Sequence, residues 1–243
     1  MIKLIVSDLD GTLLPYGERV LSPELKRLIA EAEAKGIRFA VSTGRTYGEL
    51  LEIFGADVAG KVLICCDGAH YTLDGKSLYE RRIERPELSL FFKQRNSHAA
   101  FVLHGAQVNY TVGNLPPEAA RFRAQPITRE DEIREKIFKV TTYGMELSLP
   151  AYCGLRMHWD GGTHDMAQYV NRFANKGVAL SDLQTRLMLT KFETVCLGDS
   201  GNDVAMMRGA TRSFCVGDRS EELARVCTDR VARAEDALRA ILE

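Results

Sequence analysis

The stretch IVSDLDGTLL, residues 5–14, decides the fold of this chain. A short apolar run leads into Asp8, Leu9 and Asp10, and Gly11 and Thr12 follow before the sequence becomes apolar again. The run predicts a strand that is buried on both faces, as in a parallel sheet. Side chains two positions apart on extended backbone point the same way, so both carboxylates would face one point beyond the strand.

The bulk composition is that of a folded globular chain. Of the 243 residues, 45% are hydrophobic and 27% charged, and the net charge is −1. This balance gives no reason to expect a nucleic-acid partner. No apolar run approaches the roughly 18 residues of a membrane span, so we expect no membrane partner. Six cysteines without CxxC spacing favour a reduced, cytoplasmic protein, and no feature indicates the oligomeric state.

Strand and helix patterns alternate at both ends of the chain. Strands are predicted at 2–7, 37–42 and 61–66, with helices at 22–36 and 46–55 between them. The same alternation returns with helices at 176–189, 202–209, 220–227 and 235–243 and strands at 194–198 and 213–217. This order predicts an α/β fold with a doubly wound parallel sheet.

The middle of the chain has a different pattern. Residues 70–83 predict a hairpin around Asp74-Gly75. Beyond it, helices are expected at 86–96 and 129–136 and strands at 99–105, 136–144 and 154–159, while 165–173 fits either a strand or a helix. We therefore predict a separate α+β insertion at 83–172, which interrupts a catalytic core made of residues 1–82 and 173–243.

Three predicted strand ends carry polar residues to one edge of the sheet. Asp8 follows the first strand, Thr43 follows the second, and Asp199 and Asp203 follow a late strand. Ligands bind at this edge in open parallel sheets. With Asp10, four carboxylates would meet there and repel each other without a cation, and hard oxygen ligands of this kind suit Mg²⁺.

The same edge has the groups that a phosphoryl group requires. Thr43 supplies a hydroxyl, Gly44 an accessible backbone N–H, and Lys176 a positive charge at a predicted helix start. A carboxylate can act as the nucleophile and form an aspartyl-phosphate. In the Asp-Leu-Asp spacing, one carboxylate can attack phosphorus while the other handles the proton of the leaving group.

Four motifs in this order resemble the haloacid dehalogenase superfamily: DLDGT at 8–12, STGR at 42–45, NKG at 175–177 and GDSGND at 198–203. The insertion after the second motif and the pairing of the last two are similar to its Cof-like sugar-phosphatase branch. The resemblance implies a HAD-like core and a cap, formed by the insertion, that closes over the site and selects the substrate.

The resemblance also implies roles for individual residues. Asp8 would be the nucleophile and a Mg²⁺ ligand, and Asp10 the general acid and base, with its backbone carbonyl on the metal. Asp199 would be a further metal ligand. Thr43 and Lys176 would hold the phosphoryl group, and Asn202 and Asp203 would orient the phosphate and the metal's water shell.

Two segments depart from the family pattern. Asp67, in CDGAH, stands where the branch often has Asn-Gly-Ala, and would disfavour an anionic leaving group or bind a sugar hydroxyl. VGDRSEE at 216–222 replaces a Gly-Asn-Ala loop. Two arginines are further candidates for substrate contact: Arg45, for which a structural ion pair is the alternative, and Arg156 on a predicted strand of the insertion.

The sequence therefore predicts a Mg²⁺-dependent phosphatase of small phosphorylated metabolites, most simply sugar phosphates. Two alternatives remain open at this point. A phosphomutase would pass the phosphoryl group from Asp8 to a second hydroxyl instead of water. A non-catalytic sensor would bind a phosphorylated ligand without turnover, although it would not need a nucleophile paired with an acid.

Overall fold

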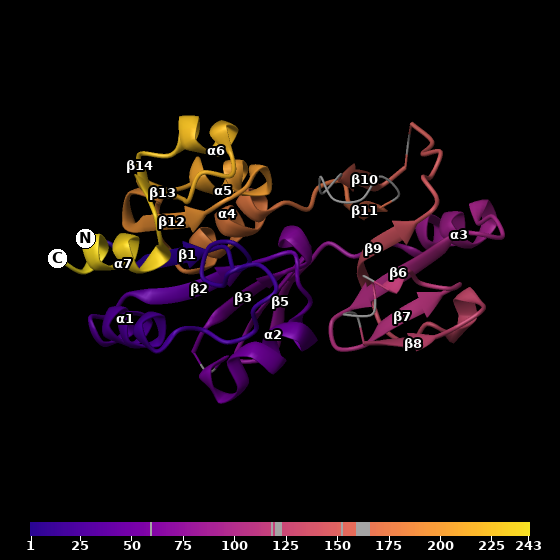
Figure 1. Ribbon diagram of the computed structural model, residues 1–243, viewed down its shortest axis with the longest axis horizontal. Coiled ribbons are helices and arrows are strands. Elements are labelled where there is room, and N and C mark those ends of the chain that lie inside the picture. The colour runs from indigo at the N-terminus through magenta and orange to yellow at the C-terminus, as the bar shows by residue number, and fades with distance from the viewer. Residues whose placement is uncertain (59, 118, 120–122, 152, 159–165) are drawn as a thin grey trace. The chain divides into compact units, whose positions relative to one another are not determined.

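The computed structural model describes residues 1–58, 60–117, 119, 123–151, 153–158 and 166–243. They form two compact units (Figure 1). The first unit comprises Met1–Arg45, Leu50–Tyr79 and Asn175–Glu243, and the second comprises Thr46–Glu49 and Glu80–Ala174. Among the described residues, no helix combines the length and apolarity that a membrane crossing requires.

The first unit is built around an eight-stranded sheet in the order β14-β13-β12-β1-β2-β3-β4-β5. The strands are β1 (Leu4–Ser7), β2 (Arg38–Ser42), β3 (Val62–Cys65), β4 (His70–Leu73), β5 (Lys76–Glu80), β12 (Thr194–Gly198), β13 (Arg212–Val216) and β14 (Asp229–Val231). Pairing is parallel from β14 through β3, and β4 runs antiparallel to β3. Because β1 lies between β2 and β12, the strand order reverses at β1.

Helices cover both faces of this sheet (Figure 1). They are α1 (Pro23–Ala34), α2 (Tyr47–Phe54), α4 (Lys176–Arg186), α5 (Val204–Met207), α6 (Glu221–Val226) and α7 (Ala234–Leu242), with short 3₁₀ turns η1 (Gly55–Val58), η2 (Cys66–Gly68), η5 (Lys191–Glu193) and η6 (Gly201–Asp203). Leu180 of α4 and Met206 of α5 pack with Leu4 and Val6 of β1 in one buried cluster. The predicted α/β fold with a doubly wound parallel sheet is confirmed.

Local sequence explains how these elements begin and turn. Ser22 caps α1 by accepting a hydrogen bond from the Leu25 N–H at 3.0 Å, and Pro23 occupies the first turn. The predicted hairpin joins β4 and β5 through Asp74 and Gly75, whose φ angles of 51° and 74° are those of a tight hairpin turn. Glycine adopts such angles without a Cβ penalty.

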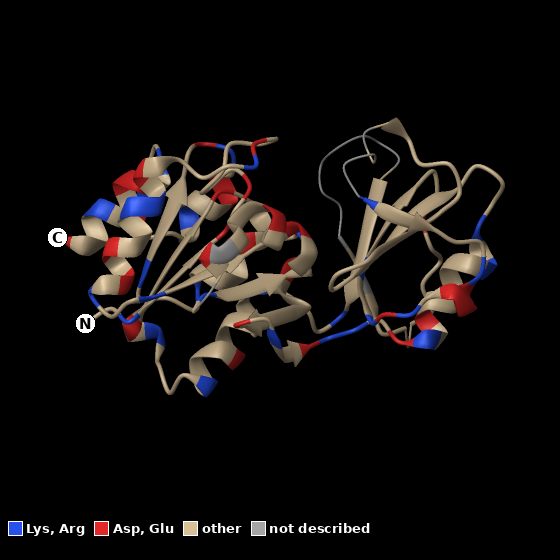
Figure 2. Ribbon diagram, turned by 90° about the horizontal axis from the view of Figure 1, so that it is seen from below, with Lys and Arg blue, Asp and Glu red and all other residues tan. Residues whose placement is uncertain are grey.

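The second unit contains a six-stranded sheet in the order β10-β11-β9-β6-β7-β8. Its elements are α3 (Arg85–Gln94), β6 (Ala100–Gly105), β7 (Asn109–Val112), β8 (Ala124–Pro126), η4 (Glu130–Glu132), β9 (Ile137–Tyr143), β10 (Leu155–His158) and β11 (Met166–Asn171). Phe91 of α3 packs against Phe101 and Tyr169 of the sheet. In Figure 2 the strands are mostly tan, and the blue and red of charged residues lie mainly on helices and loops.

The structure decides two predictions about the second unit. The helix predicted at 129–136 is wrong, because only the 3₁₀ turn η4 forms there. The Glu132 carboxylate accepts hydrogen bonds from the Thr128 and Arg129 N–H groups, and only Ile133 offers an apolar contact, so no amphipathic stripe favours a longer helix. The ambiguous segment at 165–173 contains strand β11, which pairs with both β9 and β10.

Candidate active site

The candidate site lies at the carboxyl edge of the parallel sheet in the first unit. Asp8 follows β1, Thr43 follows β2 and Asp199 follows β12. These strands are parallel neighbours, so their ends meet at one edge, beside the reversal of strand order at β1. Ligands of doubly wound sheets bind at this place.

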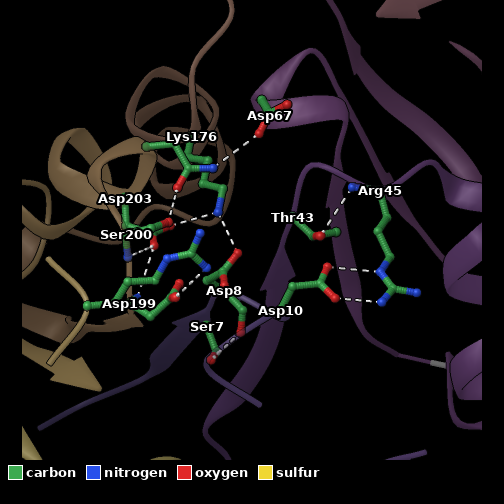
Figure 3. Close-up of polar contacts among 12 residues, drawn as sticks. Ser7, Asp8, Asp10, Thr43, Arg45, Asp67, Lys176, Asp199, Ser200 and Asp203 are labelled. Atoms are coloured by element: carbon green, nitrogen blue, oxygen red, sulfur yellow. Dashed lines mark hydrogen bonds and ion pairs between the residues drawn. The ribbon is translucent and has the colours of Figure 1, made fainter. Parts of the chain in front are cut away.

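A buried ion cluster forms the centre of the site (Figure 3). The Lys176 Nζ donates to Asp8 Oδ1 at 2.5 Å and to Asp203 Oδ1 at 2.7 Å. The Lys176 side chain is 1% exposed, and the side chains of Asp8 and Asp203 are 7% and 0% exposed. Charges are buried to this extent only when they are paired, so Lys176 stabilises both carboxylates.

Local backbone structure places each member of this cluster. Asn175 caps helix α4 by accepting from the Val178 N–H at 2.8 Å, which fixes Lys176 in the first helical turn. Asp203 Oδ2 accepts from the backbone N–H groups of Asp199 and Ser200, both at 3.2 Å. One carboxylate therefore holds the loop after β12 and also binds Lys176.

The electrostatics of the cluster are strongly perturbed. Burial raises the pKa of the Asp8 carboxyl well above its ordinary value; Lys176 opposes this rise, whereas Asp203 and Asp199 add to it. Burial alone would lower the pKa of Lys176, but Asp203 and Asp8 outweigh it and raise that pKa. Such shifts around a carboxylate and a lysine at a sheet edge are typical of functional sites.

The residues present fit a divalent cation. Carboxylate oxygens of Asp8, Asp199 and Asp203 lie within 4.8 Å of one another. Asp199 Oδ1 is buried and has no hydrogen-bond partner among the described residues. Burial raises the pKa of the Asp199 carboxyl; Asp203 adds to this rise, whereas the hydrogen bond from Tyr16 opposes it. Oxygen ligands of this kind, with one open lone-pair direction, suit Mg²⁺.

The Asp10 side chain lies outside this carboxylate cluster and pairs with Arg45 (Figure 3). Arg45 Nη2 donates to Asp10 Oδ1 at 2.5 Å and Nε donates to Oδ2 at 2.9 Å, so both carboxylate oxygens are occupied. The structure contains the ion pair considered for Arg45, and its contact with substrate stays a prediction.

Thr43 and Gly44 follow β2 directly. Thr43 is buried, its backbone N–H donates to the Ile64 carbonyl at 2.9 Å, and its Oγ1 accepts from the Arg45 N–H at 3.2 Å. The hydroxyl proton of Thr43 is thus available to an acceptor in the site. Gly44 is partly exposed next to it.

A second polar chain links the loops after β12 and β3. Ser200 Oγ donates to Asn202 Oδ1 at 2.7 Å, and Asn202 Nδ2 donates to Asp67 Oδ1 at 3.3 Å. Asp67 belongs to the turn η2, where Cys66 and Asp67 have φ angles of 51° and 56°. These are unfavourable angles for residues with a Cβ, and strain of this kind concentrates at functional sites.

Two residues of the site were missed from the sequence. The Tyr16 hydroxyl donates to Asp199 Oδ2 at 2.5 Å, and the Arg219 guanidinium lies over the Tyr16 ring, 4.3 Å from its centroid. For Arg219, the only signal in the sequence was that residues 216–222 differ from the family's Gly-Asn-Ala loop. Nothing in the sequence connects Tyr16 with Asp199, 183 positions away.

Arg156 is the one candidate site residue that lies in the second unit. Its backbone belongs to β10, opposite Val170 of β11. Its side chain is outside the described part of the structure, so its predicted contact with substrate stays a prediction.

Comparisons with known proteins agree in one family. The model of the haloacid dehalogenase-like hydrolase family matches residues 5–241. Among curated proteins, the chain is 27% identical over 227 residues to the 5-amino-6-(5-phospho-D-ribitylamino)uracil phosphatase YcsE of Bacillus subtilis strain 168; the match covers 90% of this chain and 86% of that relative.

Solved structures share the fold along the whole chain. A haloacid dehalogenase-like hydrolase from Bacteroides thetaiotaomicron superposes with a TM-score of 0.86 at 20% identity, covering 99% of this chain and 100% of that one. A sugar phosphatase of HAD subclass IIB superposes with a TM-score of 0.77 at 18% identity, covering 98% and 97%.

Proposed function

Because this chain belongs to the haloacid dehalogenase-like hydrolase family, as its four motifs predicted, we propose that it is a Mg²⁺-dependent phosphatase of small phosphomonoesters, most simply sugar phosphates. The observation that carries the proposal is the buried carboxylate of Asp8, hydrogen-bonded to Lys176 and next to Asp199 and Asp203. The curated relative named above, itself a phosphatase of a small phosphorylated metabolite, supports the substrate class.

In the first step of the proposed reaction, a carboxylate oxygen of Asp8 attacks the phosphorus atom of the substrate. A bond forms between this oxygen and phosphorus, and the bond between phosphorus and the ester oxygen breaks. Asp10, released from Arg45 and protonated, gives this proton to the departing ester oxygen and so becomes the carboxylate. Lys176 and the Thr43 hydroxyl bind the phosphoryl oxygens, where negative charge is held in the transition state.

In the second step, Asp10 takes a proton from a water molecule, and the water oxygen attacks the phosphorus of the aspartyl-phosphate. The bond to Asp8 breaks, inorganic phosphate leaves, and both carboxyl groups return to their starting states. Mg²⁺ held by Asp8, Asp199 and the Asp10 carbonyl would offset the repulsion between the nucleophile and the phosphate. Asp203 and Asn202 would keep the surrounding ligands in place.

The insertion at 83–172, which falls within the second unit, is proposed as the cap that selects the substrate. Within the first unit, Asp67 bears on the same choice. Its carboxylate, bonded to Asn202 at the edge of the site, would repel a second anionic group on the substrate and accept a hydrogen bond from a sugar hydroxyl. We place the protein in the cytoplasm as part of this proposal, because its six cysteines are free thiols.

The test is phosphate release with Mg²⁺ across a panel of phosphomonoesters that includes hexose, pentose and glycerol phosphates, phosphoglycolate, nucleotides and pyridoxal phosphate. The Asp8→Asn variant serves as the blank, because it keeps the shape of the side chain and removes the nucleophile. Release by the wild-type protein alone supports the proposal. Isomerised phosphate ester without free phosphate would instead indicate a phosphomutase, and binding of an ester without turnover would indicate a sensor.

A further inference from the structure

The contact between Tyr16 and Asp199 has a feature that the reaction described above does not explain. Tyr16 is 55% exposed, yet its hydroxyl reaches into the buried acidic cluster and donates to Asp199 Oδ2 at 2.5 Å. Asp199 itself is 2% exposed. A side chain that is largely in solvent therefore makes a short hydrogen bond to one of the most buried carboxylates of the site.

This bond makes the two oxygens of Asp199 different. Oδ2 is bound by the Tyr16 hydroxyl, whereas Oδ1 is buried without a hydrogen-bond partner among the described residues. A carboxylate that turns about its terminal torsion can exchange its oxygens, since that torsion is broad and roughly two-fold. The Tyr16 hydroxyl opposes this rotation and leaves one defined oxygen, Oδ1, without a hydrogen-bond partner among the described residues.

Further contacts hold the Tyr16 ring where its hydroxyl can act. The Arg219 guanidinium covers the ring, and Arg219 Nη1 also lies 3.9 Å from Asp199 Oδ2. Gly11 also lies next to this contact with a φ of +85°, and a Cβ placed there would lie 2.3 Å from Asp199 Oδ2 and 2.6 Å from the Tyr16 hydroxyl. A side chain at position 11 would therefore displace the tyrosine or the carboxylate from this contact.

We propose that Tyr16 is a positioning residue that orients the Asp199 carboxylate, so that its free oxygen binds the divalent cation of the site. Arg219 supports Tyr16 by packing on its ring. Groups that hydrogen-bond to a metal ligand fix its orientation, and their loss typically weakens metal binding by about 10- to 100-fold. The inference rests on the proposed function, because it assumes that Asp199 is a metal ligand.

The test measures cation binding directly, without turnover. Mg²⁺ and Mn²⁺ are each titrated into the wild-type protein and the Tyr16→Phe variant. Calorimetry measures the binding of Mg²⁺, and electron paramagnetic resonance measures the binding of Mn²⁺. The control is Tyr71→Phe, because the Tyr71 hydroxyl also donates to a carboxylate at 2.5 Å, that of Asp182. Asp182 lies on α4 outside the acidic cluster, so this control removes the same kind of bond without touching the site.

We expect Tyr16→Phe to raise the dissociation constant for both cations by roughly 10-fold or more, and Tyr71→Phe to leave it within about twofold. In a phosphatase assay, the Mg²⁺ concentration for half-maximal activity should shift by the same factor in Tyr16→Phe. Activity at saturating Mg²⁺ should recover, because the hydroxyl takes no part in the chemical steps.

Three results would overturn the inference. Equal affinity in the wild-type protein and Tyr16→Phe would show that Asp199 is oriented without Tyr16. Tighter binding by the variant would show that the hydroxyl competes with the cation for Asp199. Both results leave the proposed phosphatase intact, whereas a wild-type protein that binds neither cation would remove the metal from the proposed function as well.

Discussion

Both sheets of this protein bury polar side chains within their strands, but among the described residues the first sheet also buries carboxylates just beyond its strand ends. In the first unit, Asp8 and Asp199 lie just beyond strand ends, and Lys176 lies at a helix start. In the second unit, buried polar side chains lie within the strands: His104 in β6, Lys139 and Thr141 in β9, and Gln168 in β11.

This difference follows from the backbone. Within a strand the pleat decides which face a side chain occupies, and His104 faces Lys139 across the sheet as Thr141 faces Gln168. Beyond a strand end the chain is free to turn, so several loops can bring like charges to one point. Charges gathered at one point can act on a bound group, whereas polar side chains within strands hydrogen-bond between strands, as His104 and Thr141 do.

The largest expected effect tests whether the strand-end charges carry the chemistry. Asp8→Asn should lower turnover by at least about a thousandfold, because the amide is a poor nucleophile. Phosphate release and thermal unfolding would be measured together, with Asp182→Asn as the matched control. Turnover at the wild-type level in Asp8→Asn would show that Asp8 is not the nucleophile. The charges beyond the strand ends of the first sheet would then not carry the chemistry.

The next prediction concerns how much the buried charge cluster contributes to the free energy of unfolding. Lys176→Met should lower the free energy of unfolding by about 3–5 kcal/mol, because it leaves Asp8 and Asp203 without their cation. The comparison is Lys136→Met in the second unit. The Lys136 Nζ pairs with Glu80 Oε2 at 2.6 Å, but the Lys136 side chain is 52% exposed. This exposed pair should contribute no more than about 1 kcal/mol.

Urea unfolding of both lysine variants at one pH and salt concentration provides the measurement. Equal losses in the two variants would mean that burial does not distinguish the strand-end cluster from an ordinary surface pair. Phosphate release should fall with Lys176→Met and stay near the wild-type level with Lys136→Met.

A smaller effect is expected for substrate choice at the edge of the site. Asp67→Asn should raise kcat/KM for esters with a second anionic group relative to neutral sugar phosphates by about 5- to 10-fold. Two unit charges 4 Å apart interact by about 1 kcal/mol in water, and by more where solvent is partly excluded. Asp57→Asn is the control, since the Asp57 side chain is 62% exposed. An unchanged ratio would leave substrate choice to the second unit.

The smallest effect on turnover is expected in the second unit. Thr141→Val removes the hydroxyl that hydrogen-bonds to the His104 ring at 2.9 Å, so the free energy of unfolding should fall by about 1–3 kcal/mol. Hydrolysis of a simple aryl phosphate should stay within about threefold of wild type. A loss in turnover as large as that of Asp8→Asn would contradict the assignment of the chemistry to the first unit alone.

Much of the first unit was predictable because each of its signals is local. The apolar run before Asp8, the cap and proline at the start of α1 and the Asp74-Gly75 turn each act within a few residues. The second unit was less predictable. Its short strands β7 and β8 carry no strong periodicity, and the charged segment around Glu132 has a helical composition but no apolar face to bury.

Contacts between residues far apart in the sequence could not be predicted, because no local signal specifies them. The sequence placed Arg45 beside the site, but its bidentate pairing with Asp10 depends on how the loops after β1 and β2 meet. The role of Tyr16 depends on the loop after β12 and on Arg219, which reach it from positions far along the chain.

The sequence by itself determined the α/β class, the doubly wound sheet and the residues that stand at its carboxyl edge, because strand polarity puts successive strand ends on one side. Only the tertiary structure decided which of these residues touch. Lys176 joins Asp8 to Asp203, Arg45 holds Asp10 apart from them, and Tyr16 selects one oxygen of Asp199. Hydrogen bonds depend on fractions of an ångström between loops, and the spacing of residues along the chain does not specify such distances.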